Sequence, residues 1–275
     1  MGELLKGVLA APLGLRPHTR QDQGATMVMD KGIGLRQTYD LVDVAAPYID
    51  YWKLPFGSAL LYSEERLHDK VRVLRQAGIV VYPGGTALEI AVHQGRLDAF
   101  LSWVSRMGMD GVEVSDGTLP MSLDTRLDSI MRAKSRGLRV LTEVGKKAHG
   151  SRFDPTEFWR SVALDREAGA EQVIVEGREA GRGVGIYDDD GVINPAELDR
   201  LVAGAENPAR LLWEAPEKEH QVSIIERFGG NVGIGNVPPG EVLALECLRL
   251  GLRADTFKLV LDAEREVGGE REAAV

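Results

Sequence analysis

Four glutamates in this sequence stand at the ends of short apolar segments, where their carboxylates could bind a divalent cation or transfer protons. They are Glu113, Glu143, Glu176 and Glu214. Alternate side chains of a β-strand share one face, so valines that face a layer of helices leave the intervening glutamate on the inner face of a sheet. We therefore expect these carboxylates, together with Ser115, to lie on one inner face.

The same alternation brings further charged side chains to that face, with Lys53 beside Tyr51 and Asp30 beside Val28. Several glutamates in one cleft raise each other's pKa values and oppose folding unless positive charge lies nearby. One source is Mg²⁺, which prefers carboxylate oxygens. The other is a set of local cations, namely Lys53, Lys146, Lys147 and Arg178. Taken singly, a strand-end glutamate could equally be the partner in a structural salt bridge.

Glycine-rich stretches follow several of the apolar segments, at residues 31–34, 83–86, 181–185 and 229–231. Glycine lets backbone N–H groups approach a phosphate or sulfonate closely. A tight turn between a strand and a helix would need glycine for its own backbone and is the alternative. Their recurrence beside the cations favours an anion-binding site.

Short β-branched segments alternate with longer segments of helical period along most of the chain. The predicted strands cover residues 26–30, 50–54, 79–82, 111–115, 140–144, 172–177, 210–214 and 231–235. The predicted helices cover residues 35–47, 64–77, 87–107, 122–136, 155–168, 195–205, 218–228 and 239–250. Asp154-Pro155 and Asn194-Pro195 are typical helix starts, and Gly78 and Gly169 are typical helix ends.

This alternation predicts a parallel sheet with helical crossovers, and we expect a single (β/α)8 TIM barrel with a parallel eight-stranded core. The strand ends recur at intervals of roughly 30 residues, as expected for eight units in about 250 residues. An open doubly wound sheet is the alternative. Polar residues at nearly every strand end favour the barrel, which carries its chemistry there. We expect an arm over residues 1–23, the catalytic barrel over 24–258 and a tail over 259–275.

Composition argues against several classes of protein. The 275-residue chain has 33 Lys and Arg against 42 Asp and Glu, a formal charge of −9, which disfavours general binding of nucleic acid or anionic membranes. No segment is long and apolar enough to predict a membrane span. The apolar run at residues 7–15 is expected to pack on the domain rather than to act as a signal peptide. Cys247 is the only cysteine, so no internal disulfide forms and we expect a reducing, cytoplasmic location.

The strand-end sequences resemble those of the phosphosulfolactate synthase family, in order and over about residues 24–257. The matching strings are TMVMDKG at 26–32, YPGGT at 82–86, EVSDG at 113–117, TEVGKK at 142–147, EGRE at 176–179, EAPEK at 214–218 and GLRADTF at 251–257. The resemblance implies a (β/α)8 barrel lyase that adds sulfite to phosphoenolpyruvate with Mg²⁺, giving (2R)-O-phospho-3-sulfolactate. In some organisms of the family this step opens coenzyme M biosynthesis, and in others it supplies sulfolactate.

On this resemblance we assign roles to the residues that match. The expected metal ligands are Glu113, Glu143 and Glu176, with Glu214 in reserve. Lys146 is the first candidate for the proton donor and Lys53 the second. The expected partners are small anionic substrates, phosphoenolpyruvate and sulfite. The residues expected to bind them are Arg178, Lys147, Ser115, Asn236 and the backbone of Gly84, Gly85 and Gly235.

The chain departs from the family pattern at two places that we expect at the mouth of the barrel. After Lys53 the family usually has a Gly-Trp-Gly-Thr-Ser-like stretch, where this chain has LPFGS at 54–58, and Gly233 stands where asparagine is usual. The nucleophile or the acceptor could therefore differ. The alternatives are a related barrel enzyme that adds another nucleophile to an enolpyruvyl-type acid, and a non-catalytic, stress-associated homologue. We also expect a homo-oligomer, and the helix positions that could contact a partner or the strands are Trp103, Phe158 and Trp159.

Overall fold

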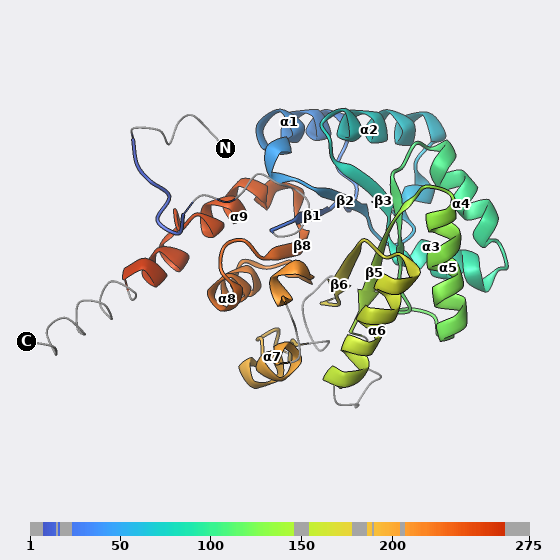
Figure 1. The fold of residues 1–275 in the computed structure, drawn as a ribbon. Helices are drawn as coiled ribbons and strands as arrows, with labels where there is room; N and C mark the ends of the chain where they lie inside the picture. The colour runs from blue at the N-terminus through green and yellow to red at the C-terminus, as the bar shows by residue number, and fades with distance from the viewer. Residues whose placement is uncertain are drawn as a thin grey trace, which may run out of the picture.

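The protein is described here from a computed structural model, which covers residues 8–14, 16, 24–145, 154–177, 186–188, 190–203 and 207–261. The strands within the described residues are β1 (Thr26–Met29), β2 (Tyr51–Leu54), β3 (Val80–Pro83), β4 (Gly111–Val114), β5 (Arg139–Val144), β6 (Gln172–Val175), β7 (Leu212–Glu214) and β8 (Gly233–Val237). They form one parallel sheet in the order β3-β2-β1-β8-β7-β6-β5-β4. The sheet curls into a barrel surrounded by helices (Figure 1), and the expected TIM barrel is confirmed.

The ends of the sheet order, β3 and β4, are joined beside Asp110. Its N–H donates to the carbonyl oxygen of Val81 at 2.9 Å, and its Oδ2 accepts from the N–H of Val81 at 3.0 Å. These contacts make the barrel nearly closed, so the carboxyl ends of all the strands surround one mouth.

The helices of the described residues are α1 (Leu35–Ala45), α2 (Glu64–Gln76), α3 (Gly85–His93), α4 (Leu97–Arg106), α5 (Leu123–Ser135), α6 (Pro155–Ala168), α7 (Pro195–Val202), α8 (Lys218–Phe228) and α9 (Val242–Arg249). Residues 254–261 are also helical. Both predicted helix starts are confirmed, because the side chains of Asp154 and Asn194 accept hydrogen bonds from the first turns of α6 and α7. Both predicted helix ends, Gly78 and Gly169, have positive φ.

Two apolar layers hold the barrel together. The inner layer fills the barrel below the mouth and consists of Met27, Tyr51, Val80, Tyr82, Leu141, Ile174 and Leu212. The outer layer lies between the strands and the helices and includes Val28, Trp52, Val112, Val114 and Trp213. Alternate residues of one strand therefore fall into different layers, as the strand period requires. The residues that continue the inner set toward the carboxyl ends of the strands are polar in β2, β4, β5, β6 and β7, whereas in β1 the next residue is Met29.

Two predicted elements differ from the observed ones. The helix predicted over residues 87–107 is two helices, α3 and α4, because Gly95 adopts a φ of 65° between them and ends the helical path. The last strand was predicted over residues 231–235 but runs from Gly233 to Val237. Gly233 therefore begins β8, opposite Leu212, and lies at the end of the barrel away from the mouth. Our placement of Gly233 at the mouth is wrong.

The aromatic residues considered for partner contacts pack against the chain itself. Phe158 is buried, Trp103 and Trp159 pack against the outer core, and the indole N–H of Trp159 donates to the carbonyl oxygen of Leu201 at 2.6 Å. The described part of the amino-terminal arm lies beside the end of α9, where the N–H of Leu13 donates to the carbonyl oxygen of Leu250 (Figure 1). Within the described ranges, the helices are too short or too polar to cross a bilayer.

Candidate active site

A cavity of about 300 Å³ opens at the carboxyl ends of the strands. Its wall includes the expected residue Gly85 at the start of α3 and brings together the following strand-end residues that were expected from the sequence: Lys53, Glu113, Ser115, Glu143, Glu176, Glu214 and Asn236. They come from five strands or from the residue directly after a strand. Strand alternation therefore predicts the inner face correctly for the side chains of this set other than Asn236, which has a positive φ and the parity of the outer-layer residue Ile234.

The side chain of Lys53 lies among three of the glutamates. Its Nζ is 3.0 Å from Oε2 of Glu113, 3.2 Å from Oε1 of Glu214 and 3.7 Å from Oε2 of Glu143. Lys53, Glu113 and Glu214 are each less than one-tenth exposed. One buried ammonium thus offsets the repulsion between carboxylates that come from β4, β5 and β7.

Burial and mutual charge shift the titration of this group. Burial opposes the charge on Lys53, but Glu113, Glu214 and Glu143 outweigh it and raise the pKa of Lys53 well above its ordinary value. Burial raises the pKa of Glu143 well above its ordinary value, and the neighbouring charge of Glu214 raises it further. Burial also raises the pKa of Glu113, although Lys53 opposes that shift. Lys53 is therefore charged throughout the physiological range, and Glu143 holds a proton more tightly than it would in the unfolded chain.

Backbone donors fix two of the carboxylates. Oε1 of Glu113 accepts from the N–H of Gly85 at 2.9 Å, and Oε2 of Glu214 accepts from the N–H of Gly177 at 2.9 Å. Gly85 begins α3, so Glu113 also lies at the positive end of that helix. Since their other oxygens face Lys53, Glu113 and Glu214 already have strong partners on both sides.

The remaining two carboxylates converge beside Gly117. A Cβ atom built on Gly117 would lie 3.5 Å from Oε1 of Glu143 and 3.7 Å from Oε1 of Glu176, so only a residue without a side chain leaves this space open. Mg²⁺ is usually held by one or two carboxylates together with water and substrate oxygens. The donors at this point fit Mg²⁺ in that manner. Within the described part of the chain, no three His, Cys, Asp or Glu side chains form a complete metal cluster.

Asp30 was expected on the inner face, and this expectation is wrong. Its strand neighbour Val28 packs in the outer layer, and Asp30 accepts a hydrogen bond from the indole N–H of Trp52 at 3.1 Å and one from the ammonium of Lys70. Asp30 follows the last residue of β1, and its Oδ1 also accepts from the N–H groups of residues 32 and 33. It therefore shapes the loop after β1 from behind the sheet and does not enter the cavity.

Two of the three glycines expected to bind anions through their backbone have N–H groups that donate within the chain. The N–H of Gly84 donates to the carbonyl oxygen of Leu54 at 2.7 Å, and that of Gly85 donates to Glu113. Gly235 lies inside the barrel, where an added Cβ would be 2.8 Å from Cε of Met27. The N–H groups of Gly84 and Gly85 therefore already have acceptors, and Gly235 packs against the inner layer. Three other expected site residues, Lys146, Lys147 and Arg178, lie outside the described residues.

Glu89 belongs to the site and was not found from the sequence. It lines the cavity from α3 and is buried. Its Oε1 accepts from Oγ of Ser115 at 2.5 Å, and its Oε2 accepts from the N–H groups of Thr118 at 3.0 Å and Leu119 at 2.5 Å. Glu89 thereby holds the loop after β4 against the rim. The sequence does contain an indication of this role, because Glu89 is the only acidic residue in the apolar helix GTALEIAVH and an acid there needs buried partners.

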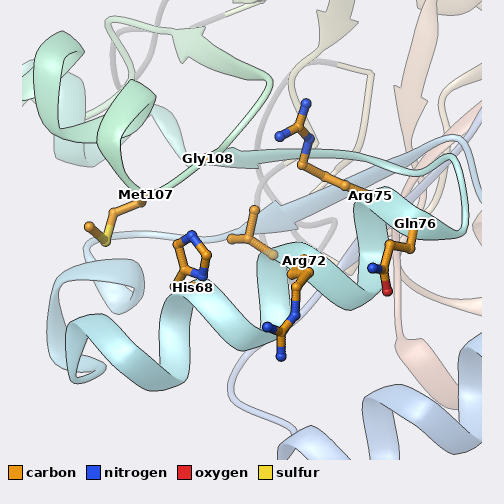
Figure 2. Close-up of a pocket in the computed structure, with 7 residues that line it drawn as sticks. His68, Arg72, Arg75, Gln76, Met107 and Gly108 are labelled. Carbon is orange, nitrogen blue, oxygen red and sulfur yellow. The ribbon is translucent and has the colours of Figure 1, made fainter.

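A second hollow lies on the outer surface between α2 and the end of α4 (Figure 2). Its cations are Arg72 and Arg75, whose guanidinium groups point in different directions in Figure 2. Arg72 pairs with Asp69 at 2.7 Å and Arg75 with Asp110 at 2.8 Å. Because both charges are already neutralised within the chain, this hollow has no concentrated charge comparable with that of the barrel mouth.

Solved barrel structures share the fold at low sequence identity. The carboxyl transferase domain of Rhizobium etli pyruvate carboxylase aligns with a TM-score of 0.55 at 10% identity, covering 89% of this chain and 47% of that chain. A 3-hexulose-6-phosphate synthase from Salmonella typhimurium aligns with a TM-score of 0.51 at 14% identity, covering 86% and 99%. At such identities the likeness shows the fold alone. Fold and cavity together define a (β/α)8 barrel with an acid-lined mouth.

Sequence comparison then gives the family. The family model for (2R)-phospho-3-sulfolactate synthase (ComA) matches residues 15–255. Proteins named phosphosulfolactate synthase are 39% identical over 237 residues in Methanocaldococcus jannaschii, covering 86% of this chain and 94% of that protein, and 35% identical over 249 residues in Bacillus subtilis, covering 90% and 97%. The chain belongs to the (2R)-phospho-3-sulfolactate synthase family, which is a family of enzymes.

Proposed function

We propose that this protein joins sulfite to phosphoenolpyruvate in the cavity around Lys53, giving (2R)-O-phospho-3-sulfolactate as a carbon–sulfur lyase acting in the direction of synthesis. The observation that carries the proposal is the buried Lys53 among three carboxylates at the mouth of a barrel of this family. The relatives named above carry the same product in their name. The single cysteine, Cys247, suits a reducing compartment such as the cytoplasm.

The reaction must bring two anions together and then stabilise new negative charge. The sulfur lone pair of sulfite forms the bond to C3 of phosphoenolpyruvate, and the electrons of the C2–C3 double bond move toward the carboxylate as an enediolate. A proton then adds to C2, and no group leaves. A fixed positive charge such as that of the buried Lys53 offsets this charge without reorganisation during the reaction.

Mg²⁺ is part of this proposal. Glu143 and Glu176 would hold it beside Gly117, where their oxygens converge, while Glu113 and Glu214 keep Lys53 in position. When bound there, Mg²⁺ supplies positive charge next to the substrate carboxylate. The four glutamates, all expected as metal ligands from the sequence, are thus divided into two that would bind Mg²⁺ and two that position Lys53.

Lys146 remains our candidate for the group that protonates C2. An ammonium group is a better proton donor when its pKa is lowered toward the working pH, whereas the carboxylates around Lys53 raise the pKa of that residue. Lys53 therefore suits charge neutralisation better than proton transfer. Lys146→Ala should keep its far-ultraviolet circular dichroism and lose turnover, whereas Lys258→Ala, which removes an exposed lysine that is not part of the cavity wall, should keep most of its activity. Full activity of the Lys146 variant would remove Lys146 from the mechanism.

The direct test incubates the purified protein with phosphoenolpyruvate, sulfite and Mg²⁺ and follows phosphosulfolactate by mass spectrometry. Product that depends on all three additions supports the proposal. Mg²⁺-dependent binding of phosphoenolpyruvate without product would favour a relative that uses another nucleophile. Absence of binding would favour a non-catalytic, stress-associated role.

A further inference from the structure

Two residues that line the cavity adopt a backbone conformation that side chains rarely accept. Within the described segments, the non-glycine residues with positive φ are Phe56 and Asn236, both at 57°, and both contribute to the cavity wall. Asparagine tolerates the left-handed region, whereas a bulky residue such as phenylalanine is an outlier there. Such strain persists where the surroundings fix it, and it clusters at functional sites.

The loop that carries Phe56 is fixed by main-chain and short side-chain contacts rather than by the phenylalanine ring. The carbonyl oxygen of Pro55 accepts from the N–H of Ser58 at 3.1 Å and from its Oγ at 2.7 Å. On the inner side the loop packs against Gly84, where an added Cβ would lie 3.0 Å from the backbone nitrogen of Phe56. The loop conformation is therefore expected to survive loss of the ring.

Phe56 completes an apolar wall in a cavity that is otherwise mostly polar. The wall consists of Met29, Pro55 and Phe56, and charged or hydroxyl side chains line most of the remaining surface. Met29 is buried, while Phe56 is 45% exposed and so lies at the rim. An apolar surface of this kind favours a hydrocarbon group and gives no hydrogen bonds to an oxyanion.

We propose that Met29, Pro55 and Phe56 form the subsite for the methylene end of an enolpyruvyl acid, and that Phe56 limits what can be attached to its C3 atom. This inference rests on the proposed function, and it names the part of the substrate that the wall receives. The phosphate and carboxylate of such an acid belong with the cations, so its only apolar group, the =CH₂ carbon, is left for this wall. A phenylalanine placed at the rim by a fixed loop backbone restricts the space beyond that carbon.

The test compares phosphoenolpyruvate with its 3-methyl homologue, 2-phosphoenolbutyrate, as acceptors of sulfite in the presence of Mg²⁺. One methyl group in an apolar pocket changes kcat/KM by about tenfold or more. We expect the preference for phosphoenolpyruvate to fall by about tenfold in Phe56→Ala and to be kept in Phe56→Trp. Phe56→Gly adopts positive φ without strain and should match the alanine variant. Leu61→Ala, which removes an apolar side chain that is 88% exposed from the same connection, is the control and should keep the wild-type preference.

The outcomes separate this inference from the proposed function. An active protein whose preference is the same in the wild type, Phe56→Ala and Phe56→Gly overturns the subsite and leaves the function standing. If the wild type forms no product, calorimetric binding of the two acids with Mg²⁺ replaces turnover as the readout. A binding preference that falls in both variants then supports the subsite without the reaction. An unchanged preference, or no binding of either acid, overturns it.

Discussion

Lys53 Nζ lies 3.2 Å from Oε1 of Glu214, although the two residues are 161 positions apart in the sequence. Their strands, β2 and β7, are separated in the sheet by β1 and β8. The curvature of the sheet brings these side chains together across the inside of the barrel, and the contact therefore joins the fold to the chemistry. The remaining oxygen of Glu214 is held by the N–H of Gly177, so this ion pair is fixed from both sides.

Lys53→Met should destabilise the protein and abolish turnover. It leaves buried carboxylates without their ammonium, and removal of one member of a buried ion pair costs about 3–5 kcal/mol. The loss should shrink as the pH falls toward 5, because the carboxyls then take up protons. Urea unfolding of the wild type and the variant at neutral pH and at pH 5 measures this loss of stability. Lys258→Met, which breaks an exposed pair with Glu226, should cost less than about 1 kcal/mol. Equal losses in the two variants would contradict the account.

Glu143→Gln should stabilise the folded protein at neutral pH while it lowers activity. The pKa of Glu143 is raised in the folded state, so the folded protein holds this proton more tightly than the unfolded chain does. The contribution of Glu143 to stability is therefore complete below its unfolded pKa and is lost as the pH rises through the folded pKa. Glutamine does not titrate and escapes this loss.

Urea unfolding between pH 4 and pH 8 tests the sign of this effect. The advantage of Glu143→Gln over wild type should be near zero at the acid end and reach on the order of 1 kcal/mol at pH 8. Glu167→Gln, an exposed position on α6, is the control and should show no such trend. An advantage that instead grew toward acid pH would mean that burial does not dominate at Glu143.

Gly85→Ala should be destabilising, and Ser115→Gly should relieve it. An alanine Cβ at position 85 would lie 2.2 Å from Oγ and 2.8 Å from Cβ of Ser115, and such overpacking costs about 1–3 kcal/mol. The double variant should therefore be more stable than the sum of the single effects by at least about 0.5 kcal/mol. Thermal and urea unfolding give the comparison. Gly57→Ala, with open space at its Cβ, should be nearly neutral, and additive effects at 85 and 115 would refute the predicted contact.

Lys70→Met should destabilise the protein by about 3–5 kcal/mol, because it leaves the carboxylate of Asp30 buried without its ammonium partner. Asp30→Asn combined with Lys70→Met should recover part of that loss, since the charge is then removed together with its partner. Urea unfolding of the two single variants and the double variant forms the cycle. A double variant as unstable as the sum of the two singles would show that the pair does not act as a unit.

The sequence predicts the barrel well because its signals are local and repeat along the chain. β-Branched runs, helix starts at Asp154 and Asn194, and glycine helix ends each act within a few residues, and these predictions agree with the structure. The errors occur where the backbone conformation, and not the hydrophobic pattern, sets the end of a helix or the start of a strand. Gly95 divides one predicted helix, and β8 starts two residues later than its apolar pattern suggests.

The site is only partly predictable, because local sequence patterns do not show which side chains pair across the barrel. Alternation identifies Glu113, Glu143 and Glu214 as inward-facing residues, and it correctly pairs Asp30 with Val28, but it does not show that this pair faces outward. The partner of Asp30, Lys70, could have been identified from the helical pattern of α2. Lys70 lies on the apolar stripe of α2 with Leu67, Val71 and Leu74, and a lysine there requires a buried acid.

The central claim is that the cavity at the barrel mouth, whose lining includes Lys53 and Gly117, receives the substrate. A crystal structure of the protein soaked with phosphoenolpyruvate and Mg²⁺ tests it most directly. The account predicts the acid in that cavity, with the metal beside Glu143 and Glu176 and the =CH₂ carbon toward Phe56. Phosphoenolpyruvate bound instead in the hollow between α2 and α4, with the mouth of the barrel holding neither metal nor acid, would contradict it.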